Sequence, residues 1–288
     1  MKIYLNGAFV EKEKAVVSVF DHGLLYGDGV FEGIRSYGGL VFRLKEHIDR
    51  LYRSADAIQL KIPLTKLEMM NATVDTLKEN KLKDAYIRLV VTRGPGDLGL
   101  DPRKCKVATV FIIADKIKLY PEEFYRKGLK IVTATTKRNL PQALDPRIKS
   151  LNYLNNILAQ IDAIKAGTEE AIMLTHDGFV AECTGDNIFM ITKGELVTPP
   201  TTVGALEGVT REAVMNVARA LDIPVYEKML KMDDMYAADE MFLTGTAAEI
   251  IPVIEVDDRK IGSGKPGSMT LKLLEEFHKT TKTDGVRY

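Results

Sequence analysis

Lys149 is the residue whose type and position most directly suggest chemistry. It stands in the stretch DPRIKSLNYL (145–154), where an irregular segment leads into a helix predicted over 151–166. The dipole at a helix N-terminus disfavours positive charge and so favours a neutral lysine, which can attack a carbonyl and form a Schiff base. If the helix already includes Lys149, Tyr153 lies one turn further along the same face. The alternative is a solvated lysine that precedes a helix.

Glu182 is the second candidate. It ends an apolar strand predicted over 179–182, in the stretch FVAECTGDNIF (179–189). A carboxylate in an apolar strand needs a cation or a hydrogen-bond donor, and a protonated ring nitrogen would serve. The alternative is an exposed glutamate at a sheet edge.

Two turns rich in glycine and threonine could bind an anion. GVTRE (208–212) opens a predicted helix, and GTAAE (245–249) follows a predicted strand. Each offers backbone N–H groups and a hydroxyl, and the first adds a helix dipole, so together they indicate a phosphate site. Ordinary helix capping is the alternative for each turn. Neither is a Walker loop, because the sequence lacks GxxxxGK[ST].

Two arginines interrupt apolar patterns in the first third of the chain. Arg50 breaks the apolar face of a helix predicted over 44–58, and Arg88 breaks a strand predicted over 85–92. Arginine in such a position usually has an anionic partner, either a carboxylate or a phosphate. For each arginine an internal salt bridge is the alternative to a ligand.

Composition excludes several classes of protein. Lys plus Arg and Asp plus Glu both number 40 among 288 residues, so there is no basic excess of the kind that nucleic acids or membrane surfaces attract. The 2 cysteines are far apart and the 4 histidines lack HxxH spacing, which argues against a disulfide framework and a metal site. We find no membrane-spanning run and no apolar signal core in MKIYLNGAFVEKEK, and we expect a cytoplasmic protein.

The elements that must position these residues occur in hairpin runs rather than in βαβ alternation, which predicts a mixed α+β fold. Domains are predicted over 1–116 (small, N-terminal) and 128–288 (large, C-terminal), joined by a linker over 117–127. In the first domain we expect strands over 3–5, 16–19, 30–37, 40–42, 85–92 and 107–114, and helices over 44–58 and from Thr65. In the second we expect a strand over 128–136, an antiparallel meander over 171–197, a strand over 241–244, and helices over 151–166, 208–221 and 266–282.

These parts together are the requirements of a pyridoxal-phosphate enzyme that acts on amino acids. The motifs YGDGVFEGIR, HIDRL, YIR, IKSLNYL, FVAECTGDNIF, GVTREAV and GTAAEI follow one another along nearly the whole chain. In this combination the sequence resembles the class IV (fold-type IV) aminotransferases, and within them the branched-chain amino-acid aminotransferases. The resemblance implies a two-domain fold with antiparallel strands in the larger domain, pyridoxal 5'-phosphate as cofactor, transfer of the amino group from leucine, isoleucine or valine to 2-oxoglutarate, and a homodimer or larger homo-oligomer.

The resemblance also implies roles for single residues. Lys149 would carry the cofactor and move the proton, Glu182 would pair with its ring nitrogen, and Tyr153 would bond its O3′ oxygen. The implied phosphate binders and the residue packed under the ring are Arg50, Val209, Thr210, Thr246 and Leu206. The implied substrate-binding residues are Tyr26, Phe31, Arg35, Tyr86, Arg88, Leu100 and Ala247.

Among these substrate residues, Tyr86 and the turn at Thr246 and Ala247 would hold the amino acid's carboxylate. Arg88 would orient Tyr86 and meet the distal carboxylate of glutamate, with Arg35 as the next candidate. Phe31, Tyr26 and Leu100 would line an apolar pocket, the last two contributed by a neighbouring subunit.

Three alternatives remain at this point. A D-amino-acid aminotransferase of the same fold shares IKSLN, although Tyr86-x-Arg88 together with FEGIR argues against it. An aminodeoxychorismate lyase would catalyse a different reaction on the same fold. A non-catalytic phosphate-binding module would lack a reactive lysine, and the presence of all the motif groups argues against it.

Overall fold

The structure is a computed structural model that describes residues 1–116 and 120–288. The chain forms two compact units. The N-terminal unit comprises Met1–Ile117, Ile148–Asn152 and Thr281–Tyr288, and the C-terminal unit comprises Lys118–Arg147 and Tyr153–Thr280. The segments Ile148–Asn152 and Thr281–Tyr288 therefore pack with the N-terminal unit, although they come later in the chain. The predicted contiguous ranges do not include this arrangement. Of the predicted linker over 117–127, residues 117–119 lie outside the described residues, and α4 (Glu122–Lys127) follows them. The boundaries at 116 and 128 stay a prediction.

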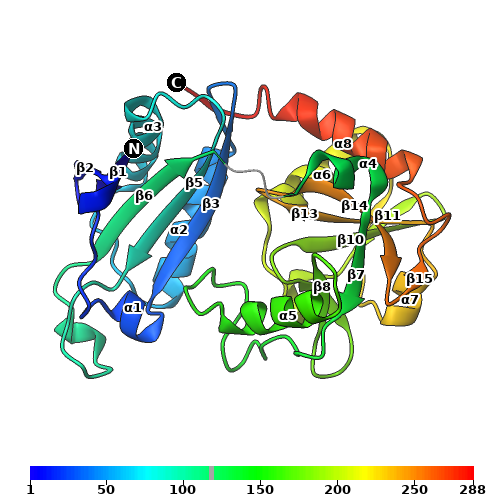
Figure 1. The fold of residues 1–288 in the computed structure, drawn as a ribbon, viewed down its shortest axis with the longest axis horizontal. Helices are drawn as coiled ribbons and strands as arrows, with labels where there is room; N and C mark the ends of the chain where they lie inside the picture. Colours follow the sequence, from blue (N-terminus) through cyan, green and yellow to red (C-terminus); the bar gives the residue numbers. More distant parts are fainter. Residues whose placement is uncertain (117–119) are drawn as a thin grey trace. The chain divides into compact units, whose positions relative to one another are not determined.

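A seven-stranded sheet forms the frame of the N-terminal unit, in the order β16-β4-β3-β5-β6-β1-β2. Figure 1 labels β3, β5, β6, β1 and β2 of this sheet. Its pairings are antiparallel. The strands are β1 (Lys2–Leu5), β2 (Ala8–Glu11), β3 (Gly29–Tyr37), β4 (Leu40–Phe42), β5 (Ala85–Thr92), β6 (Thr109–Asp115) and β16 (Gly285–Arg287). β3 and β5 form the centre of this sheet, and they carry most of the candidate residues of the unit.

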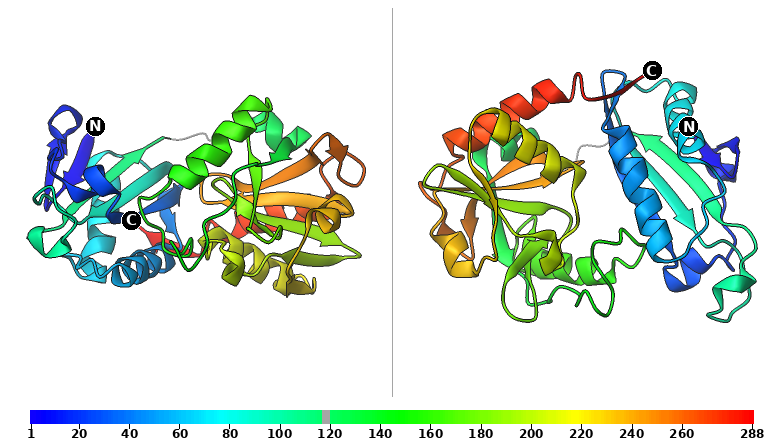
Figure 2. Two further views of the ribbon diagram at one scale, coloured as in Figure 1. Left: turned by 90° about the horizontal axis from the view of Figure 1, so that it is seen from below. Right: turned by 180° about the vertical axis from the view of Figure 1, so that it is seen from behind.

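Two helices cover one face of this sheet: α2 (Leu44–Ala57) lies along β3, and α3 (Lys66–Glu79) packs beside it against β6 (Figure 2). The apolar residues of α2 recur every three to four positions, and Leu44, Ile48 and Leu51 are buried, as the periodicity predicts. Thr65 and Glu68 form the predicted capping box at the start of α3. The unit's shorter helices are α1 (His22–Tyr26) and the 3₁₀ turns η1 (Lys12–Lys14) and η2 (Pro102–Lys104).

A nine-stranded mixed sheet forms the C-terminal unit, in the order β12-β11-β10-β13-β14-β7-β8-β9, with β15 paired to β14. Its strands are β7 (Leu129–Thr133), β8 (Ala171–Leu174), β9 (Val180–Cys183), β10 (Asn187–Thr192), β11 (Glu195–Thr198), β12 (Val225–Glu227), β13 (Glu240–Gly245), β14 (Glu249–Val256) and β15 (Arg259–Lys260). Its helices are α4, α5 (Leu154–Lys165), η3 (Thr201–Val203), α6 (Val209–Ala220), α7 (Met232–Tyr236) and α8 (Ser268–Thr280). α5 packs against β7 and β8, while α6 and α8 pack against β13 (Figure 1).

Two predictions about strands are wrong. The four strands over 171–197 do not form one meander, because β10 pairs with β11 and β13 rather than with β9. The stretch over 16–19 is not a strand, and Val16 and Val19 are 72% and 69% exposed. Its apolar residues therefore face outward instead of marking a buried sheet face.

The predicted α+β architecture is confirmed, with mostly antiparallel pairings in both sheets. In the parts of the chain that the structure describes, no helix is both long and apolar enough to cross a membrane.

Candidate active site

Lys149 belongs to an irregular segment of the N-terminal unit that pairs with the start of β3. Phe31 N–H donates to Lys149 O over 3.0 Å, and Leu151 N–H donates to Gly29 O over 2.9 Å. The Lys149 N–H donates to Ser54 Oγ over 3.1 Å. Helix α5 begins only at Leu154, with Tyr153 as its N-cap. The helix therefore does not include Lys149, and it begins at 154 rather than at the predicted 151, because β3 takes the backbone hydrogen bonds of this segment.

The side chain of Lys149 lies beside an aromatic and cationic cluster in the same unit. Its Nζ is 4.6 Å from the centroid of the Phe31 ring, and the Arg88 guanidinium carbon is 4.7 Å from that centroid. Arg88 Nη2 also donates to the Tyr86 hydroxyl over 3.2 Å. The structure thus brings Phe31, Tyr86, Arg88 and Lys149 together, with two cations at one aromatic ring.

Gly33 explains how the Tyr86 hydroxyl reaches its place. Gly33 lies opposite Arg88 in the β3–β5 register. A Cβ atom at Gly33 would lie 2.1 Å from the Tyr86 hydroxyl oxygen, closer than two such atoms can approach. Glycine at this position therefore leaves the space in which Tyr86 meets Arg88.

Arg50 is held by a buried carboxylate that the sequence analysis missed. Glu32 is 0% exposed, and it accepts from Arg50 Nε over 2.7 Å and from Arg50 Nη2 over 2.7 Å. Its Oε2 also accepts from His47 Nδ1 over 2.8 Å. Burial alone would raise the pKa of Glu32, but Arg50 and His47 lower it to about 2. The salt bridge left open for Arg50 is thus present, and a glutamate inside an apolar strand was the signal that could have revealed it.

The Glu32 cluster predicts an acid-sensitive stability. Because the folded pKa of about 2 lies below the ordinary 4.5, the ionised carboxylate stabilises the fold fully above about pH 5. That contribution falls as the pH drops from about 5 toward 2. We expect Glu32→Gln to lower the free energy of unfolding by about 3 kcal/mol at pH 7. The difference in the free energy of unfolding between Glu32→Gln and the wild type should become smaller below pH 5.

Denaturant titrations at several pH values measure this difference. The control is Glu68→Gln, which removes an exposed carboxylate from the capping box of α3 and should have a much smaller effect, because glutamine also serves in a capping box. A Glu32→Gln protein as stable as the wild type at pH 7 would contradict the prediction.

Glu182 is buried in the C-terminal unit, so it is not the exposed edge glutamate of the alternative interpretation. Its Oε1 accepts from Arg138 Nη2. Its Oε2 accepts from the Leu206 N–H over 2.9 Å and from Asn187 Nδ2 over 3.1 Å. Arg138 and Asn187 were not among the residues proposed from sequence. Asn187 stands in the FVAECTGDNIF motif, whereas Arg138 lies in a stretch without any pattern.

The start of α6 offers the backbone donors that an anion would need. Gly208 is the N-cap of the helix, and no side chain of the described residues caps it. A Cβ atom at Gly208 would lie 2.1 Å from Asn187 Oδ1, so glycine lets the helix start approach Asn187 closely. Val209 and Thr210, the first two residues of α6, are both buried. Their N–H groups and the helix dipole suit a phosphate.

The second anion-binding candidate is the turn between β13 and β14, which contains Thr246 and Ala247. Gly245 and Glu249 pair across it, and the Tyr125 hydroxyl donates to Ala248 O over 3.0 Å. Next to the turn, Thr244 pairs with Asn187 across the sheet, and its Oγ1 is buried without a hydrogen-bond partner among the described residues. A buried hydroxyl without a partner, on the sheet face that also bears Asn187, fits the binding of a polar group there.

The remaining substrate-binding candidates are Tyr26, Leu100 and Arg35. Tyr26 is 37% exposed and its hydroxyl donates to Leu98 O, while Leu100 is 79% exposed. Arg35 lies opposite Tyr86 in the β3–β5 register, and its guanidinium carbon is 4.8 Å from the Tyr37 ring centroid.

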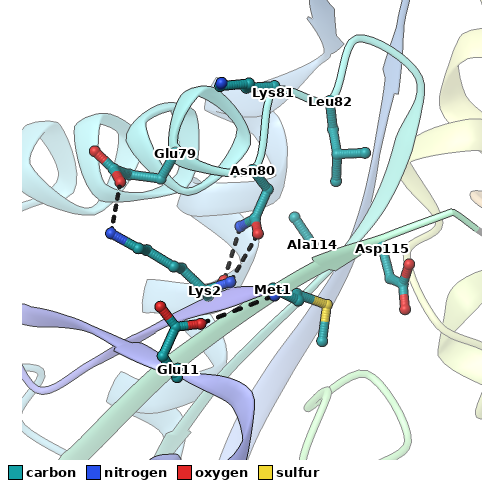
Figure 3. Close-up of a pocket in the computed structure, with 9 residues that line it drawn as sticks. All are labelled: Met1, Lys2, Glu11, Glu79, Asn80, Lys81, Leu82, Ala114 and Asp115. Atoms are coloured by element: carbon teal, nitrogen blue, oxygen red, sulfur yellow. Dashed lines mark hydrogen bonds and ion pairs between the residues drawn. The ribbon is translucent and has the colours of Figure 1, made fainter.

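A surface pocket of about 420 Å³ in the N-terminal unit contains none of the candidate residues (Figure 3). It is lined by Met1, Lys2, Glu11, Glu79, Asn80, Lys81, Leu82, Ala114 and Asp115. Lys2 pairs with Glu79 at 3.5 Å, and the Lys2 N–H donates to Asn80 Oδ1 over 2.8 Å. These contacts hold β1 to the end of α3, which gives the polar lining a structural role.

Comparison with known proteins places the chain in a family. The model of the family described as "Amino-transferase class IV" matches residues 29–256. A relative from Methanocaldococcus jannaschii is 55% identical, and the match covers 96% of this chain and 95% of the relative. The chain belongs to the class IV aminotransferases, so the family resemblance seen in the motifs is confirmed.

Solved structures agree with this assignment. The branched-chain aminotransferase of Thermoproteus uzoniensis, solved with norvaline, has a TM-score of 0.92 and 39% identity, and the match covers 99% of this chain and 96% of that chain. The branched-chain amino acid aminotransferase of Thermobaculum terrenum, solved in its PLP form, has a TM-score of 0.88 and 31% identity, with coverage of 97% and 93%.

Proposed function

We propose that this protein is a pyridoxal-phosphate-dependent branched-chain amino-acid aminotransferase, which transfers the amino group of leucine, isoleucine or valine to 2-oxoglutarate. The observation that carries the proposal is the placement of the Lys149 amine beside Phe31, in one cluster with Arg88 and Tyr86. That cluster combines a nucleophile, an apolar surface and a cation for a carboxylate. The activity in the names of the related structures supports the same substrate class.

When bound, pyridoxal phosphate supplies an electron sink for the carbanion that forms at Cα of the amino acid. In the proposed roles, the Lys149 amine holds the cofactor covalently and carries the proton from Cα. The buried Glu182 carboxylate keeps a proton on the ring nitrogen, and the Tyr153 hydroxyl bonds the O3′ oxygen. Leu206, whose N–H already orients Glu182, packs against the ring.

The phosphate would be bound by Arg50, the Val209 N–H and the hydroxyls of Thr210 and Thr246. The structure supports this role for the start of α6, where backbone N–H groups and the helix dipole favour a dianion. Arg50 itself pairs with Glu32 through two hydrogen bonds of 2.7 Å, so its proposed role toward the phosphate rests on the family resemblance.

The substrate's own carboxylate would be held by Tyr86 and by the turn at Thr246 and Ala247. Phe31 would offer the apolar surface that an aliphatic side chain needs. Glutamate brings a second carboxylate into the same pocket, where burying it without a partner would cost several kcal/mol. Arg88, already at the Phe31 ring and bonded to Tyr86, is the cation best placed to receive it.

We therefore expect Arg88→Met to impair the reaction with glutamate and 2-oxoglutarate more than the reaction with leucine and its oxo acid. The dicarboxylates should lose about 2–4 kcal/mol in kcat/KM, as for removal of one partner of a desolvated charge pair. The kcat/KM for leucine should fall less, because only the support that Arg88 gives to Tyr86 is lost for that substrate. The measurement is the ratio of the two kcat/KM values, with Arg35→Met as the control. A ratio that changes in Arg35→Met and not in Arg88→Met would assign the distal carboxylate to Arg35.

A substrate screen tests the proposed function itself. The purified protein is assayed with both enantiomers of leucine, valine and alanine against 2-oxoglutarate, and with aminodeoxychorismate for release of pyruvate. Transfer from the L-enantiomers of leucine and valine supports the proposal. Preference for D-alanine, or release of pyruvate without amino transfer, would favour the other members of the fold.

We also propose that the protein is at least a homodimer, in which Tyr26 and Leu100 complete a neighbour's pocket. Leu24 and Leu98, which are near Tyr26 and Leu100 in the sequence, are 66% and 69% exposed, and Val16 and Val19 of the same unit are 72% and 69% exposed. Exposed apolar side chains in this number often mark an interface. A cytoplasmic location is proposed as well, supported by the free thiols of Cys105 and Cys183.

Leu24→Asp is expected to weaken the dimer, because the charge would have to be buried at the interface. Leu67→Asp is the matched control, since Leu67 on α3 is 66% exposed, as is Leu24. Light scattering over a concentration series measures the mass of each variant. A wild-type protein that stays monomeric, or equal dissociation of both variants, would contradict the proposed interface.

A further inference from the structure

Arg138 is a buried arginine to which neither the motifs nor the proposed function gives a role. It is 8% exposed and lies between β7 and α5 in the C-terminal unit. Its Nη2 donates to Glu182 Oε1, its Nη1 donates to Asn156 Oδ1 over 3.1 Å, and its Nε donates to Gly204 O over 3.0 Å. One guanidinium therefore joins strand β9, helix α5 and the loop that precedes α6.

Each segment that Arg138 joins carries a residue of the proposed cofactor site. β9 carries Glu182, α5 begins directly after Tyr153, and the loop over 204–208 carries Leu206. Asn156 continues the network, because its Nδ2 donates to Thr184 O over 2.7 Å. The planar fork of arginine suits this task, since it presents donors in fixed directions, whereas lysine offers a single flexible ammonium.

The acceptor positions of Glu182 show why Arg138 matters for a ligand. Each carboxylate oxygen has about two acceptor positions. Oε2 uses both, for the Leu206 N–H and for Asn187 Nδ2. Among the residues that the structure describes, Oε1 accepts from Arg138 alone and so keeps one position. A further N–H donor would therefore be accepted at Oε1, the same oxygen that Arg138 holds.

We propose that Arg138 is a positioning residue, which fixes the Glu182 carboxylate so that Oε1 can accept the ring N–H of the cofactor. The part that concerns the ring nitrogen rests on the proposed function, whereas the coupling of Arg138 to Glu182 does not. Without Arg138, Glu182 would be a buried charge with neutral donors alone, and its side chain would lose the contact that sets the direction of Oε1.

The first test is a double-mutant cycle on the thermal unfolding of the apoprotein. Arg138→Met should lower the unfolding midpoint by about 10 °C, the size expected for breaking a buried ion pair in a chain of this length. In the Glu182→Gln background the same substitution should cost less than half as much, because the unpaired charge is gone. Additive effects would overturn the coupling.

Arg211→Met is the matched control for the cycle. Arg211 is 7% exposed in the same unit and pairs with Glu227 instead of Glu182. Its loss should destabilise the apoprotein equally in both backgrounds. A cycle in which Arg211 couples to Glu182 as strongly as Arg138 would show a general loss of stability and would overturn the specific role.

The second test is titration of each apoprotein with pyridoxal phosphate, followed by absorbance. Arg138→Met should raise the Kd at least about tenfold, and the Kd of Arg138→Lys should lie between that value and the wild-type value. In the Glu182→Gln background, Arg138→Met should not raise the Kd any further. If Arg138→Met still lowers the affinity for pyridoxal phosphate in that background, Arg138 does not act through Glu182, and the proposal is overturned. If Glu182→Gln alone leaves both Kd and turnover unchanged, the proposed ring partner fails, and the apoprotein cycle still decides whether Arg138 holds Glu182.

Discussion

Replacing Lys149 by alanine is expected to abolish amino transfer while leaving the fold and the phosphate contacts in place. The backbone of Lys149 pairs with β3 and Ser54 through its N–H and C=O groups, which alanine retains. The variant loses both the covalent attachment and the group that moves the proton, so the rate should fall on the order of 10⁴-fold or more. Cofactor should still bind, because Arg50 and the start of α6 do not depend on this amine.

Borohydride reduction provides the direct measurement. In the wild type it should fix a phosphopyridoxyl group on the peptide that contains Ile148-Lys149-Ser150, and in Lys149→Ala it should fix none. Lys165→Ala, which removes an exposed lysine at the end of α5, is the control and should label as the wild type does. Label on any other lysine would overturn the assignment of Lys149.

Local sequence patterns predicted the elements whose cause is local. The apolar periodicity of 44–58 and the capping box at Thr65 arise within one helix, and the structure has both helices. The hairpin of β3 and β4 follows from Gly38-Gly39 in the same way. Pairing between distant strands has no such signal. β14 was not predicted, and it contains Pro252, which is unfavourable in a central strand. β16 was not predicted either, and its partner β4 lies more than 240 residues earlier in the chain.

The residues of the candidate site differ in the same way, because some can be selected from their local sequence and others are brought to the site only by the fold. Glu182, Arg50 and Arg88 could be selected because their types conflict with the apolar patterns around them, and Lys149 because it stands where an irregular segment leads into a predicted helix. Glu32 gave the same kind of signal, as a carboxylate inside an apolar strand, and could have been paired with Arg50.

Arg138 could not have been found in this way. It follows a strand in a polar stretch where an arginine conflicts with nothing, and only the fold brings it to Glu182, 44 residues later. The backbone of Lys149 is a similar case, since its pairing with β3 cannot be predicted from the segment itself.

Glu182→Gln is expected to retain the fold but to lose most of the activity. Glutamine has nearly the same shape, and its amide oxygen can accept from the Leu206 N–H and from Asn187 as Oε2 does now. Its amide nitrogen would then face Arg138, donor against donor, so the apoprotein should also lose stability. A neutral amide cannot keep a proton on the ring nitrogen, and the carbanion loses its electron sink. We expect a fall in rate of about a hundredfold, or about 3 kcal/mol.

Glu170→Gln separates this loss of activity from the effect of any change at a buried carboxylate. Glu170 lies in the same unit and is 2% exposed, and its side chain accepts from the N–H groups of Ala171, Thr184 and Gly185. Glu170 has no role in the proposed cofactor site, so Glu170→Gln should cost stability, because its amide nitrogen would face an N–H donor, but should cost little activity. Single-turnover rates with leucine, measured on fully loaded protein, compare the two variants. Near-normal turnover in Glu182→Gln, or an equal loss in both variants, would show that Glu182 is not the partner of the ring nitrogen.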